Sequence, residues 1–541
     1  MDGERELALH GIGRRYGVRA PWVLRDVALT APPGTLLRVE GANGSGKSTL
    51  LRIAAGVDRP STGVVTGRPA DRTAYVPERF PPALPFPALR YLTRIGAVRG
   101  LTAADARVSA LHWLDRFGIT GYASTPLDEL SKGTCQKIAV AQALLADPAL
   151  LVLDEAWTGL DAAAREVLDA AVQERVAAGA VVLFVDHDPL RLAAATTAAL
   201  VLPPRPDAGS AAPAPVPVPS APAPAAGPAD PAAPGAGLVV IEAAGGGDVA
   251  LESGEASRAA DTLRVVVTAG ESDGVLRTLL AARPPWHVTG VRTLRGRSAQ
   301  PAPATPRLDR GSTGAAARAA ALLRYQAELV LRSHRWLPPF LFYGAVMAIG
   351  IAGGQPLLGS LGYAAALLLP VAAWTVRVCV TTEPPAARAC VASAVGTRRA
   401  QAGALLTALL AAGALGAVGT LLVTAVSGAH SDDQRTAVPV GAALVAGLMA
   451  AAVSVLLGTA VGALTNPPVV RGGGWSVLGT VIAAGAVLIT SGSPAQAAVT
   501  GLVKGSRTGT VHYPVLALGL SLLAAAAAAA VSAARPPARH T

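Results

Sequence analysis

The sequence is poor in cysteine and in charged residues. Its three cysteines among 541 residues are too few for a disulfide framework, and their spacing matches no metal site. Cys379 and Cys390 could be bridged in principle, although small buried thiols are the favoured interpretation. Charged residues make up 15% and apolar residues 51% of the chain, which is unusual for a wholly soluble protein.

The first residues, MDGERELALH, lack the apolar core of a signal peptide, so we expect the first domain to remain in the cytoplasm. A net charge of +11 would be compatible with nucleic-acid binding. However, the excess is confined to residues 300–541, which hold 16 Lys and Arg and 5 Asp and Glu, whereas the first 299 residues hold 30 of each sign. Since the second part also carries the long apolar runs, the charge pattern favours membrane orientation, and no nucleic-acid partner is expected.

A chain of this length is expected to form two or more folded units. Residues 1–202 alternate β-rich apolar runs with helical stretches, which predicts a layered α/β domain. Clear strands in this part are Leu36–Glu40, Leu150–Asp154 and Val181–Asp186.

Three segments of different composition follow the α/β domain. Residues 203–236 form a Pro/Ala-rich linker that tethers without fixing geometry. Residues 237–297 have enough apolar runs for a small α/β module, for which a structural or regulatory role is favoured over an active site. Residues 298–335 form a basic connecting segment whose part 313–335 predicts an amphipathic helix. Lying on the inner membrane surface is the natural interpretation, although a helix packed on protein would show the same pattern.

Residues 336–534 predict an all-α polytopic membrane domain of six helices, which makes membrane lipid a partner. Six apolar runs approach the roughly 20 residues that cross a bilayer, at about 336–353, 357–376, 403–427, 437–464, 474–491 and 513–534. With the N-terminus inside, the inner segments hold 13 Arg and the outer segments three basic residues, in agreement with the positive-inside rule. Arg377, near the inner end of the second run, is expected to reach the lipid head groups.

A glycine-rich motif follows the first clear strand. Residues 41–48 read GANGSGKS and fit the pattern G-x-x-x-x-G-K-[ST] in the required strand-to-helix context. The glycines let backbone N–H groups turn toward phosphate oxygens, and the next helix adds its positive N-terminus. Lys47 would reach the β- and γ-phosphates of ATP, and Ser48 would ligate Mg²⁺. The predicted nucleotide-binding residues here are Gly41, Asn43, Gly44, Ser45, Gly46, Lys47, Ser48 and Thr49.

A second apolar strand ends in two carboxylates, Asp154 and Glu155, about a hundred residues after the glycine-rich motif. The carboxyl ends of buried strands deliver side chains to the site in α/β sheets. Asp154 can therefore hold Mg²⁺ through water, and Glu155 can polarise the attacking water as general base. Such a pair is weak on its own but becomes specific behind a phosphate-binding loop.

With these motifs in order, residues 5–200 resemble the ABC (ATP-binding cassette) ATPases, which have a P-loop NTPase fold. Residues 130–134, LSKGT, stand in the place of the LSGGQ signature of that family, and residues 159–161, GLD, look like its D-loop. The resemblance implies that Ser131 and Gly133 meet the γ-phosphate bound by an opposite subunit. It also implies that Asp161 belongs to the nucleotide site, that His187 is the catalytic switch histidine, and that Tyr16 stacks on adenine. Tyr16 could otherwise be a surface tyrosine, and Asp161 a helix cap.

Two departures from the family pattern affect the rate of ATP hydrolysis that we expect. Glu78 stands where the family has the glutamine of its Q-loop; it keeps an oxygen that can face Mg²⁺ but adds a negative charge and loses the amide donor. In the signature, Lys132 replaces glycine and Thr134 replaces glutamine, while Ser131 and Gly133 remain. We therefore expect an active ATPase whose turnover or coupling differs from that of the family.

One chain has one P-loop and one signature, so the resemblance implies a dimer, of two copies or with a paralogous half-transporter. The Arg-bearing loop Thr381–Arg399 is our candidate for the contact with the groove near Glu78, although an anchor of the positive-inside kind fits equally well. An ATPase domain ahead of its membrane domain looks like an exporter, and spans with few charges suit a hydrophobic or amphipathic cargo. The alternative is a non-transporting membrane ATPase that drives conformational change in a partner protein.

Overall fold

The chain folds into two compact units, one comprising Met1–Ala221 with Leu308–Thr541 and the other Pro222–Arg307. Most of the predicted linker 203–236 and residues 298–313 of the predicted connecting segment lie outside the described residues. The computed structural model describes residues 6–17, 19–69, 71–81, 83–204, 217–219, 238–245, 255–259, 262–268, 272–282, 286–294, 314–470 and 472–535.

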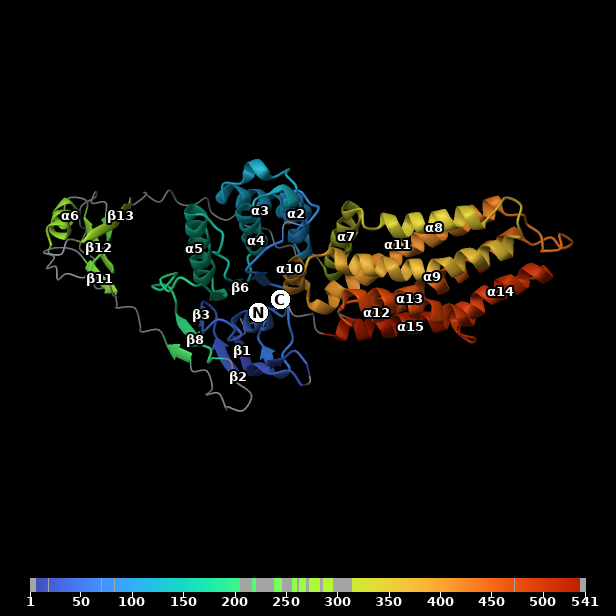
Figure 1. Cartoon of the computed structure of the whole chain (residues 1–541), viewed down its shortest axis with the longest axis horizontal. Coiled ribbons are helices and arrows are strands. Elements are labelled where there is room, and N and C mark those ends of the chain that lie inside the picture. The colour runs from blue at the N-terminus through green and yellow to red at the C-terminus, as the bar shows by residue number, and fades with distance from the viewer. Residues whose placement is uncertain are drawn as a thin grey trace. The chain divides into compact units, whose positions relative to one another are not determined.

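The α/β domain of the larger unit is built on a six-stranded sheet, which confirms the predicted fold class (Figure 1). Its strand order is β5-β6-β7-β3-β8-β9, parallel except for β9. Strands β6 and β7 are buried along their whole length, which explains their uninterrupted apolar sequences. The strands are β3 (Leu36–Glu40), β5 (Thr73–Val76), β6 (Leu150–Asp154), β7 (Val181–Val185), β8 (Ala198–Val201) and β9 (Pro217–Pro219).

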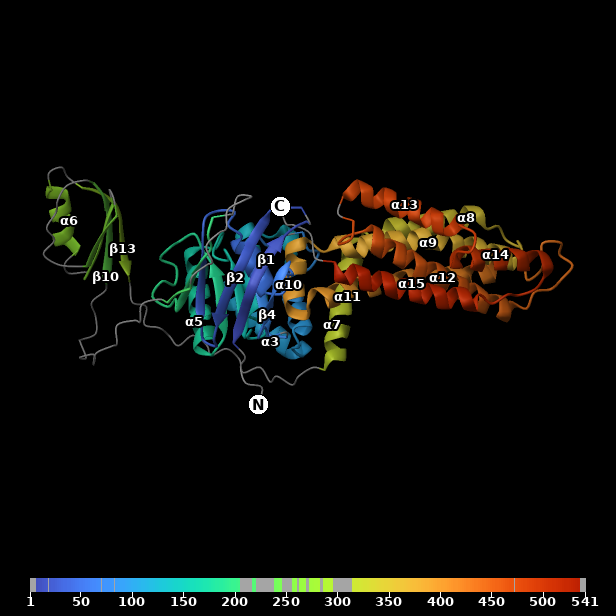
Figure 2. The same ribbon diagram turned by 90° about the horizontal axis from the view of Figure 1, so that it is seen from below.

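A second, antiparallel sheet of order β2-β1-β4 belongs to the same domain (Figure 2). Leu9 and Leu29 from this sheet share one apolar core with Leu51 and Val152, so it packs against the P-loop helix and the main sheet. Its strands are β1 (Leu7–Arg15), β2 (Trp22–Ala31) and β4 (Thr62–Thr66). The helices of the domain are α1 (Lys47–Ala54), α2 (Ala88–Val98), α3 (Ala103–Arg116), α4 (Lys132–Leu144) and α5 (Ala162–Ala177), with 3₁₀ turns at Thr120–Tyr122 and Leu127–Glu129.

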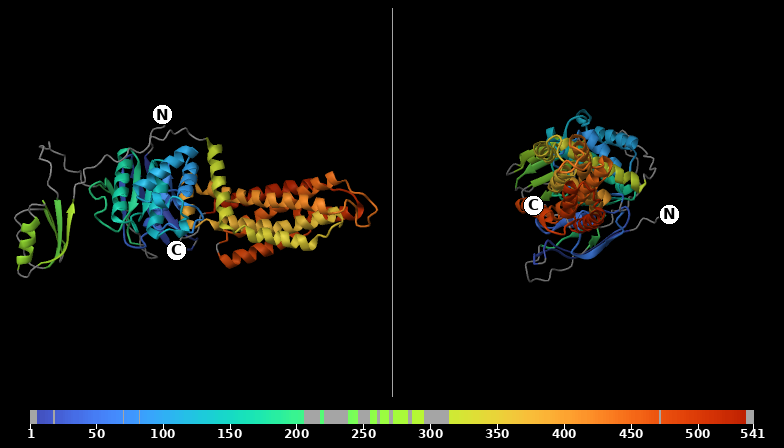
Figure 3. Two further views of the ribbon diagram at one scale, coloured as in Figure 1. Left: turned by 90° about the horizontal axis from the view of Figure 1, so that it is seen from above. Right: turned by 90° about the vertical axis from the view of Figure 1, so that its right-hand side faces the viewer.

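The rest of the larger unit is helical, and its long apolar helices run side by side (Figure 3). Glycines allow the close approach: a Cβ on Gly458 would lie 2.4 Å from the Leu369 oxygen, and one on Gly462 would lie 2.6 Å from Val376 Cβ. The helices are α7 (Ala315–Ser333), α8 (Leu337–Gly350), α9 (Leu357–Thr382), α10 (Pro385–Val395), α11 (Thr397–Val426), α12 (Val440–Thr465), α13 (Gly473–Ile489), α14 (Pro494–Thr508) and α15 (Val515–Ala534).

Each of the six predicted apolar runs contains a helix, but six independent spans are not found. In the described part of the chain, four helices are long and apolar enough to cross a membrane, namely α9, α11, α12 and α15. A fifth span requires α13 and α14 together, and this pair is bent by 48°. Helix α8 has 14 residues and is about 21 Å long, shorter than the roughly 30 Å of a hydrocarbon core. Apolar composition alone therefore overestimated the number of spans.

The segment between the fifth and sixth predicted runs contains helix α14, which Ser493 caps by accepting from Gln496 N at 3.0 Å. One further expectation for the membrane domain is corrected. Arg377 was expected to reach the lipid head groups, but its guanidinium donates to Asn466 Oδ1 at 3.1 Å and to Ser476 Oγ at 2.7 Å. It is therefore held by polar side chains of the protein.

Helix α7 is the predicted amphipathic helix, and it packs on the α/β domain. Tyr325 is fully buried, and its ring stacks on Phe86 with centroids 5.7 Å apart. Glu328 forms ion pairs with Arg90 and Arg94 of α2. The apolar face of this helix is thus covered by protein, which was the alternative to a position on the membrane surface.

Helix α10 lies within the loop that was predicted to meet the groove near Glu78, and the contact is present. Its Cys390 donates from Sγ to the Tyr75 oxygen of β5 at 3.5 Å, and Ala389 joins the core formed by β1, β2 and α1. All three cysteines are free and buried, in agreement with the interpretation as small buried thiols.

The smaller unit is a four-stranded antiparallel sheet of order β11-β12-β10-β13, with one face covered by α6 (Figure 2). Trp286, Val265 and Leu279 are buried in its core. The apolar runs recognised in this segment fall in its strands. The elements are β10 (Leu238–Ala244), β11 (Glu255–Ala259), β12 (Thr262–Thr268), α6 (Ser272–Ala281) and β13 (His287–Leu294).

Candidate nucleotide site

The glycine-rich loop between β3 and α1 has a backbone that only glycine adopts easily. Gly41, Gly44 and Gly46 have φ of 147°, 80° and 101°. A Cβ on Gly41 would lie 2.7 Å from Ser45 Oγ, and one on Gly46 would lie 2.7 Å from Leu24 Cδ2. Helix α1 begins at Lys47, directly after this loop, so its free N–H groups point toward the loop.

The basic side chain of the loop folds back on it. Lys47 Nζ donates to the carbonyl oxygens of Gly41 at 2.7 Å and Ala42 at 3.1 Å. The ammonium is therefore held against the glycine-rich loop, where a triphosphate would meet it together with the N–H groups of the loop. The predicted residues Asn43, Ser45 and Thr49 belong to the same loop and the first turn of α1.

Asp154 lies beside this loop because β6 ends there. Its Oδ1 accepts from Ser48 Oγ at 2.9 Å, and its Oδ2 accepts from the Tyr75 hydroxyl at 3.0 Å. Burial raises the pKa of Asp154 to about 6, against the hydrogen bonds from Ser48 and Tyr75, which lower it. Tyr75 was not singled out from the sequence, because a tyrosine in a short apolar strand looks like part of the core.

Glu155 and His187 are brought together by the neighbouring strands β6 and β7. Their side chains approach to 3.0 Å, between His187 Nε2 and Glu155 Oε2. Glu155 has a φ of 51°, a left-handed conformation that non-glycine residues rarely adopt, and its N–H donates to Val185 O at 3.1 Å. Such strain persists where the surroundings impose it, typically at functional positions.

Tyr16 is half-buried and turned toward α1. Its hydroxyl donates to Asp58 Oδ2 at 3.2 Å and lies 3.4 Å from Thr49 Oγ1. The guanidinium of Arg14 covers its ring at 4.4 Å from the centroid and pairs with Asp58 at 2.8 Å. This buried ion pair could not be predicted from the sequence, and it holds the tyrosine next to the P-loop helix.

The signature residues lie at the start of α4. Ser131 caps this helix by accepting from Thr134 N at 3.2 Å, and its hydroxyl lies 2.9 Å from that of Thr134. A Cβ on Gly133 would lie 3.0 Å from the Gly159 oxygen of the D-loop, so the two motifs are in contact. Among the described hydrogen bonds and ion pairs, none joins Ser131 to the P-loop of the same chain.

Asp161 connects the D-loop to the signature helix. It caps α5 by accepting from Ala164 N at 2.9 Å, as the helix-cap alternative required, and it pairs with Lys137 Nζ at 2.7 Å. The hydrogen bond from Lys137 lowers the pKa of Asp161. Gln136, the neighbour of that lysine, donates to the oxygens of Pro77 and Ala156 at 3.4 Å each. Helix α4 is therefore linked to the segments before Glu78 and after Glu155.

Glu78 lies on a cavity of about 450 Å³ next to Ser48 and Asp154. Its side chain is 45% exposed, and its nearest cation is Arg79 at 3.4 Å. Ala386 and Ala389 of α10 also line it, so one helix of the membrane domain borders the cavity. The cavity is lined by Ser48, Arg52, Tyr75, Pro77, Glu78, Arg79, Asp154, Ala386 and Ala389.

Comparison with known proteins agrees with this geometry. The family model described as ABC transporter matches residues 24–158. A zinc import ATP-binding protein ZnuC of Cereibacter sphaeroides is 37% identical over 185 residues, which cover 34% of this chain and 72% of that protein. The chain belongs to the ABC transporter family. The ZnuC of Yersinia pestis is 36% identical over 187 residues, 34% of this chain and 70% of that protein.

Solved structures of ABC proteins are similar to the same part of the chain. The ATP-binding subunit of an ABC transporter has 25% identity and a TM-score of 0.34, and covers 37% of this chain and 86% of its own. A bacterial ABC transporter cassette described as dimeric has 24% identity and a TM-score of 0.33, and covers 36% and 94%. The protein is thus an ABC ATPase domain, which hydrolyses ATP, followed by a helical region with four or five candidate membrane spans.

Proposed function

We propose that this ABC protein is an ATP-driven exporter that works as a dimer, with an ATPase domain in the cytoplasm. The observation that carries the proposal is the arrangement around α10. The candidate hydrolytic groups meet at the carboxyl edge of the sheet, and a helix of the membrane domain lines the cavity beside them.

The positions of the site residues support the following proposed roles. Lys47 and the N–H groups around Gly44 bind the phosphates of ATP, and Tyr16 stacks on the adenine. Glu155 orients and polarises the attacking water, while His187, 3.0 Å from it, holds the carboxylate and approaches the γ-phosphate.

Magnesium fits the groups near the phosphate end of the site. Ser48 and Asp154 offer a hydroxyl and a carboxylate oxygen 2.9 Å apart, the oxygen donors that Mg²⁺ prefers, and Glu78 faces the same cavity. No cluster of three or more His, Cys, Asp or Glu that could hold a metal occurs among the described residues. This agrees with an ion held by one or two protein groups together with substrate phosphates, where it would neutralise developing charge.

The site is proposed to be completed by a second subunit, because among the described residues no hydrogen bond or ion pair joins Ser131 to the P-loop of the same chain. Ser131 and Gly133 would complete the site over the γ-phosphate held by Lys47 of the partner, which is a second copy or a paralogous half-transporter. The D-loop, tied to the signature helix through Asp161 and Lys137, would lie at the same interface.

Closure of the two cassettes would be transmitted through α10 and α7. Cys390 and Ala389 fix α10 to the ATPase core, and Tyr325 and Glu328 fix α7 to it. Helix α10 directly precedes the span α11, and α7 precedes the short apolar helix α8, so a movement of the cassette biases a two-state equilibrium in the membrane domain.

The membrane domain supports an apolar or amphipathic cargo. Its cores consist mainly of Ala, Leu and Val, and within the four described helices α9, α11, α12 and α15 Arg377 is the charged residue, apart from those in the first turn of α11. The match to the relatives named for zinc import covers 34% of this chain, so the similarity does not extend over the membrane domain. The order of the domains supports export, and the excess of Arg in the predicted inner segments supports a cytoplasmic cassette.

Transport into inside-out vesicles tests the proposal. Vesicles with the wild-type chain should accumulate one class of lipophilic compound when ATP is added, and vesicles with Glu155→Gln at equal abundance should not. Accumulation that needs ATP but is the same in both would contradict the assigned base. ATP hydrolysis without accumulation of any compound in the panel would instead favour a membrane ATPase that acts on a partner protein.

A further inference from the structure

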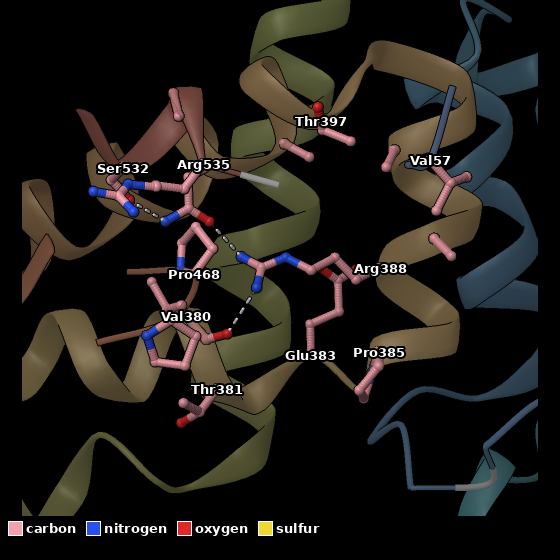
Figure 4. A pocket seen from close by; sticks show the side chains of 16 residues that line it. Val57, Val380, Thr381, Glu383, Pro385, Arg388, Thr397, Pro468, Ser532 and Arg535 are labelled. Carbon is pink, nitrogen blue, oxygen red and sulfur yellow. Dashed lines mark hydrogen bonds between the residues drawn. The ribbon is translucent and has the colours of Figure 1, made fainter. Parts of the chain in front are cut away.

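A second cavity lies on the other side of α10, separate from the nucleotide site. It has a volume of about 290 Å³, near the lower end of the roughly 300–1,000 Å³ of small-molecule sites (Figure 4). Its walls come from the inner ends of α9 and α15, the first turn of α11, helix α10, the turn after α12 and one residue of the ATPase domain, Val57. The cavity therefore lies where the membrane domain and the cassette meet.

The cavity contains an arginine whose hydrogen bonds go to neutral groups. Arg388 donates to Val380 O at 3.2 Å and to Gln401 Oε1 at 2.9 Å, and Gln401 donates in turn to Ser532 Oγ at 2.9 Å (Figure 4). Neutral groups thus hold the guanidinium in place. Among the ion pairs of the described residues, none includes Arg388 or Arg535, the second arginine on the wall. A buried guanidinium remains charged and requires a counter-charge.

The one carboxylate on the wall, Glu383, attracts Arg388, but both of its oxygens are already hydrogen-bonded. Glu383 is 4% exposed, and its two oxygens accept from the Tyr325 hydroxyl at 2.8 Å and from Gln326 Nε2 at 3.3 Å. Burial raises the pKa of Glu383, against the effect of Arg388 and of these two hydrogen bonds, which lower it. Arg59 and Arg398 add positive charge nearby. Burial lowers the pKa of Arg59, and repulsion by Arg398 lowers it further.

The remaining wall is mainly apolar. Prolines, alanines and valines surround the arginines, so the cavity pairs a cationic end with a hydrocarbon surface. These residues are Val57, Val380, Pro385, Ala389, Ala392, Ala400, Pro467, Pro468 and Ala533. Basic pockets between membrane helices on the inner side are suited to acidic lipid head groups.

We propose that this cavity binds an anionic amphiphile, with its phosphate or carboxylate on Arg388 and Arg535 and its hydrocarbon chain along the prolines and alanines. Binding would reach the ATPase site directly, because Ala389 of α10 lines both this cavity and the one that contains Asp154 and Glu78. The proposal rests on the ATPase and not on export or on the nature of the cargo.

The test compares the full chain in neutral phosphatidylcholine vesicles with the same vesicles containing phosphatidylglycerol. A parallel series adds dodecanoate to the neutral vesicles, which separates a bilayer lipid from a free acidic amphiphile. The readouts are ATP turnover and the number of acidic lipids or dodecanoate molecules retained by the purified protein in native mass spectrometry. We expect at least a twofold change in turnover and one retained molecule per chain in one or both series.

Four variants decide whether the effect comes from this cavity. Arg388→Gln keeps hydrogen-bonding groups but loses the charge, and should abolish both retention and the change in turnover. Arg388→Lys should keep most of the effect, and Arg507→Gln, an exposed arginine of α14, should keep all of it. Ala392→Leu fills the cavity without altering charge and should also abolish retention, which decides the matter if Arg388→Gln does not fold. Equal retention in wild type and Ala392→Leu, or no retention in either series, would overturn the proposal.

Discussion

The bond between Tyr325 and Glu383 provides a sharp test of how the membrane domain is attached to the cassette. Tyr325→Phe removes one hydroxyl and leaves the ring that stacks on Phe86. The hydroxyl donates at 2.8 Å to a carboxylate that is almost completely buried, so its loss leaves Glu383 with one donor, Gln326. Hydrogen bonds to charged groups are worth about 1.5–3 kcal/mol, and we expect a loss of about 2 kcal/mol.

That loss should appear as a lower unfolding temperature of the cassette, because Tyr325 belongs to its core. For a domain of about 200 residues, 1 kcal/mol corresponds to about 2–4 °C, so we expect a decrease of about 4–8 °C. The assay is thermal unfolding of the detergent-solubilised chain, followed by tryptophan fluorescence. Tyr122→Phe, at a tyrosine that is 48% exposed, is the matched control and should change little. A decrease below about 1 °C for Tyr325→Phe, or an equal decrease in both variants, would refute the role assigned to this bond.

Three further predictions concern the cassette. Gly46→Ala should weaken ATP binding at least tenfold in a nucleotide titration, because its Cβ would meet Leu24, whereas Gly118→Ala, also at positive φ but in open space, should bind normally. Glu328→Gln should lose about 1–2 kcal/mol of stability by removing the charged contacts with Arg94 and Arg90, while Glu166→Gln at an exposed position should lose none in the same melt. Burial, together with Arg116, lowers the pKa of His112, against the opposing effect of Glu174, Asp115 and Asp147. As the pH falls, the unfolded state therefore takes up the proton first, and the stability of the fold decreases through about pH 6.5. Between pH 7 and pH 5 the unfolding temperature of His112→Phe should therefore decrease less than that of the wild type. The same decrease in both proteins would contradict this role of His112.

The parts of the site that could be predicted are the motifs formed by residues adjacent in the sequence. The glycine-rich loop requires positive φ at fixed positions, and Asp154 and Glu155 end an apolar strand, so each motif carries its own geometry. Their meeting also follows from the sequence, because parallel strands deliver their carboxyl ends to one edge.

The parts that could not be predicted depend on partners distant in the sequence. Tyr75 looks like a core residue until Asp154 lies 3.0 Å from it, and Asp58 looks like a surface acid until Arg14 pairs with it. The amphipathic pattern of α7 is the same whether lipid or protein covers it, and only the contact with Phe86 decides.

In the membrane domain, the apolar composition did not reveal how long each helix is or where a helix is interrupted. The run that contains α8 is apolar from end to end, yet the helix ends at Gly350 after 14 residues. The pair α13 and α14 is interrupted at residues 490–493, where a bend of 48° follows a short polar segment. A count of apolar residues does not register either feature, whereas the hydrogen bonds at the helix ends do.

Hydrolysis by Glu155→Gln protein tests the central claim, that this site is an ATP-hydrolysing engine with Glu155 as its base. Purified wild-type and variant chains, reconstituted in the same lipid, are compared for ATP binding and for phosphate release. We expect ATP binding to be retained while phosphate release falls by about 10²–10⁴-fold, the usual contribution of a general base. If the variant released phosphate at a rate within about twofold of the wild-type rate, Glu155 would not be the general base of this site.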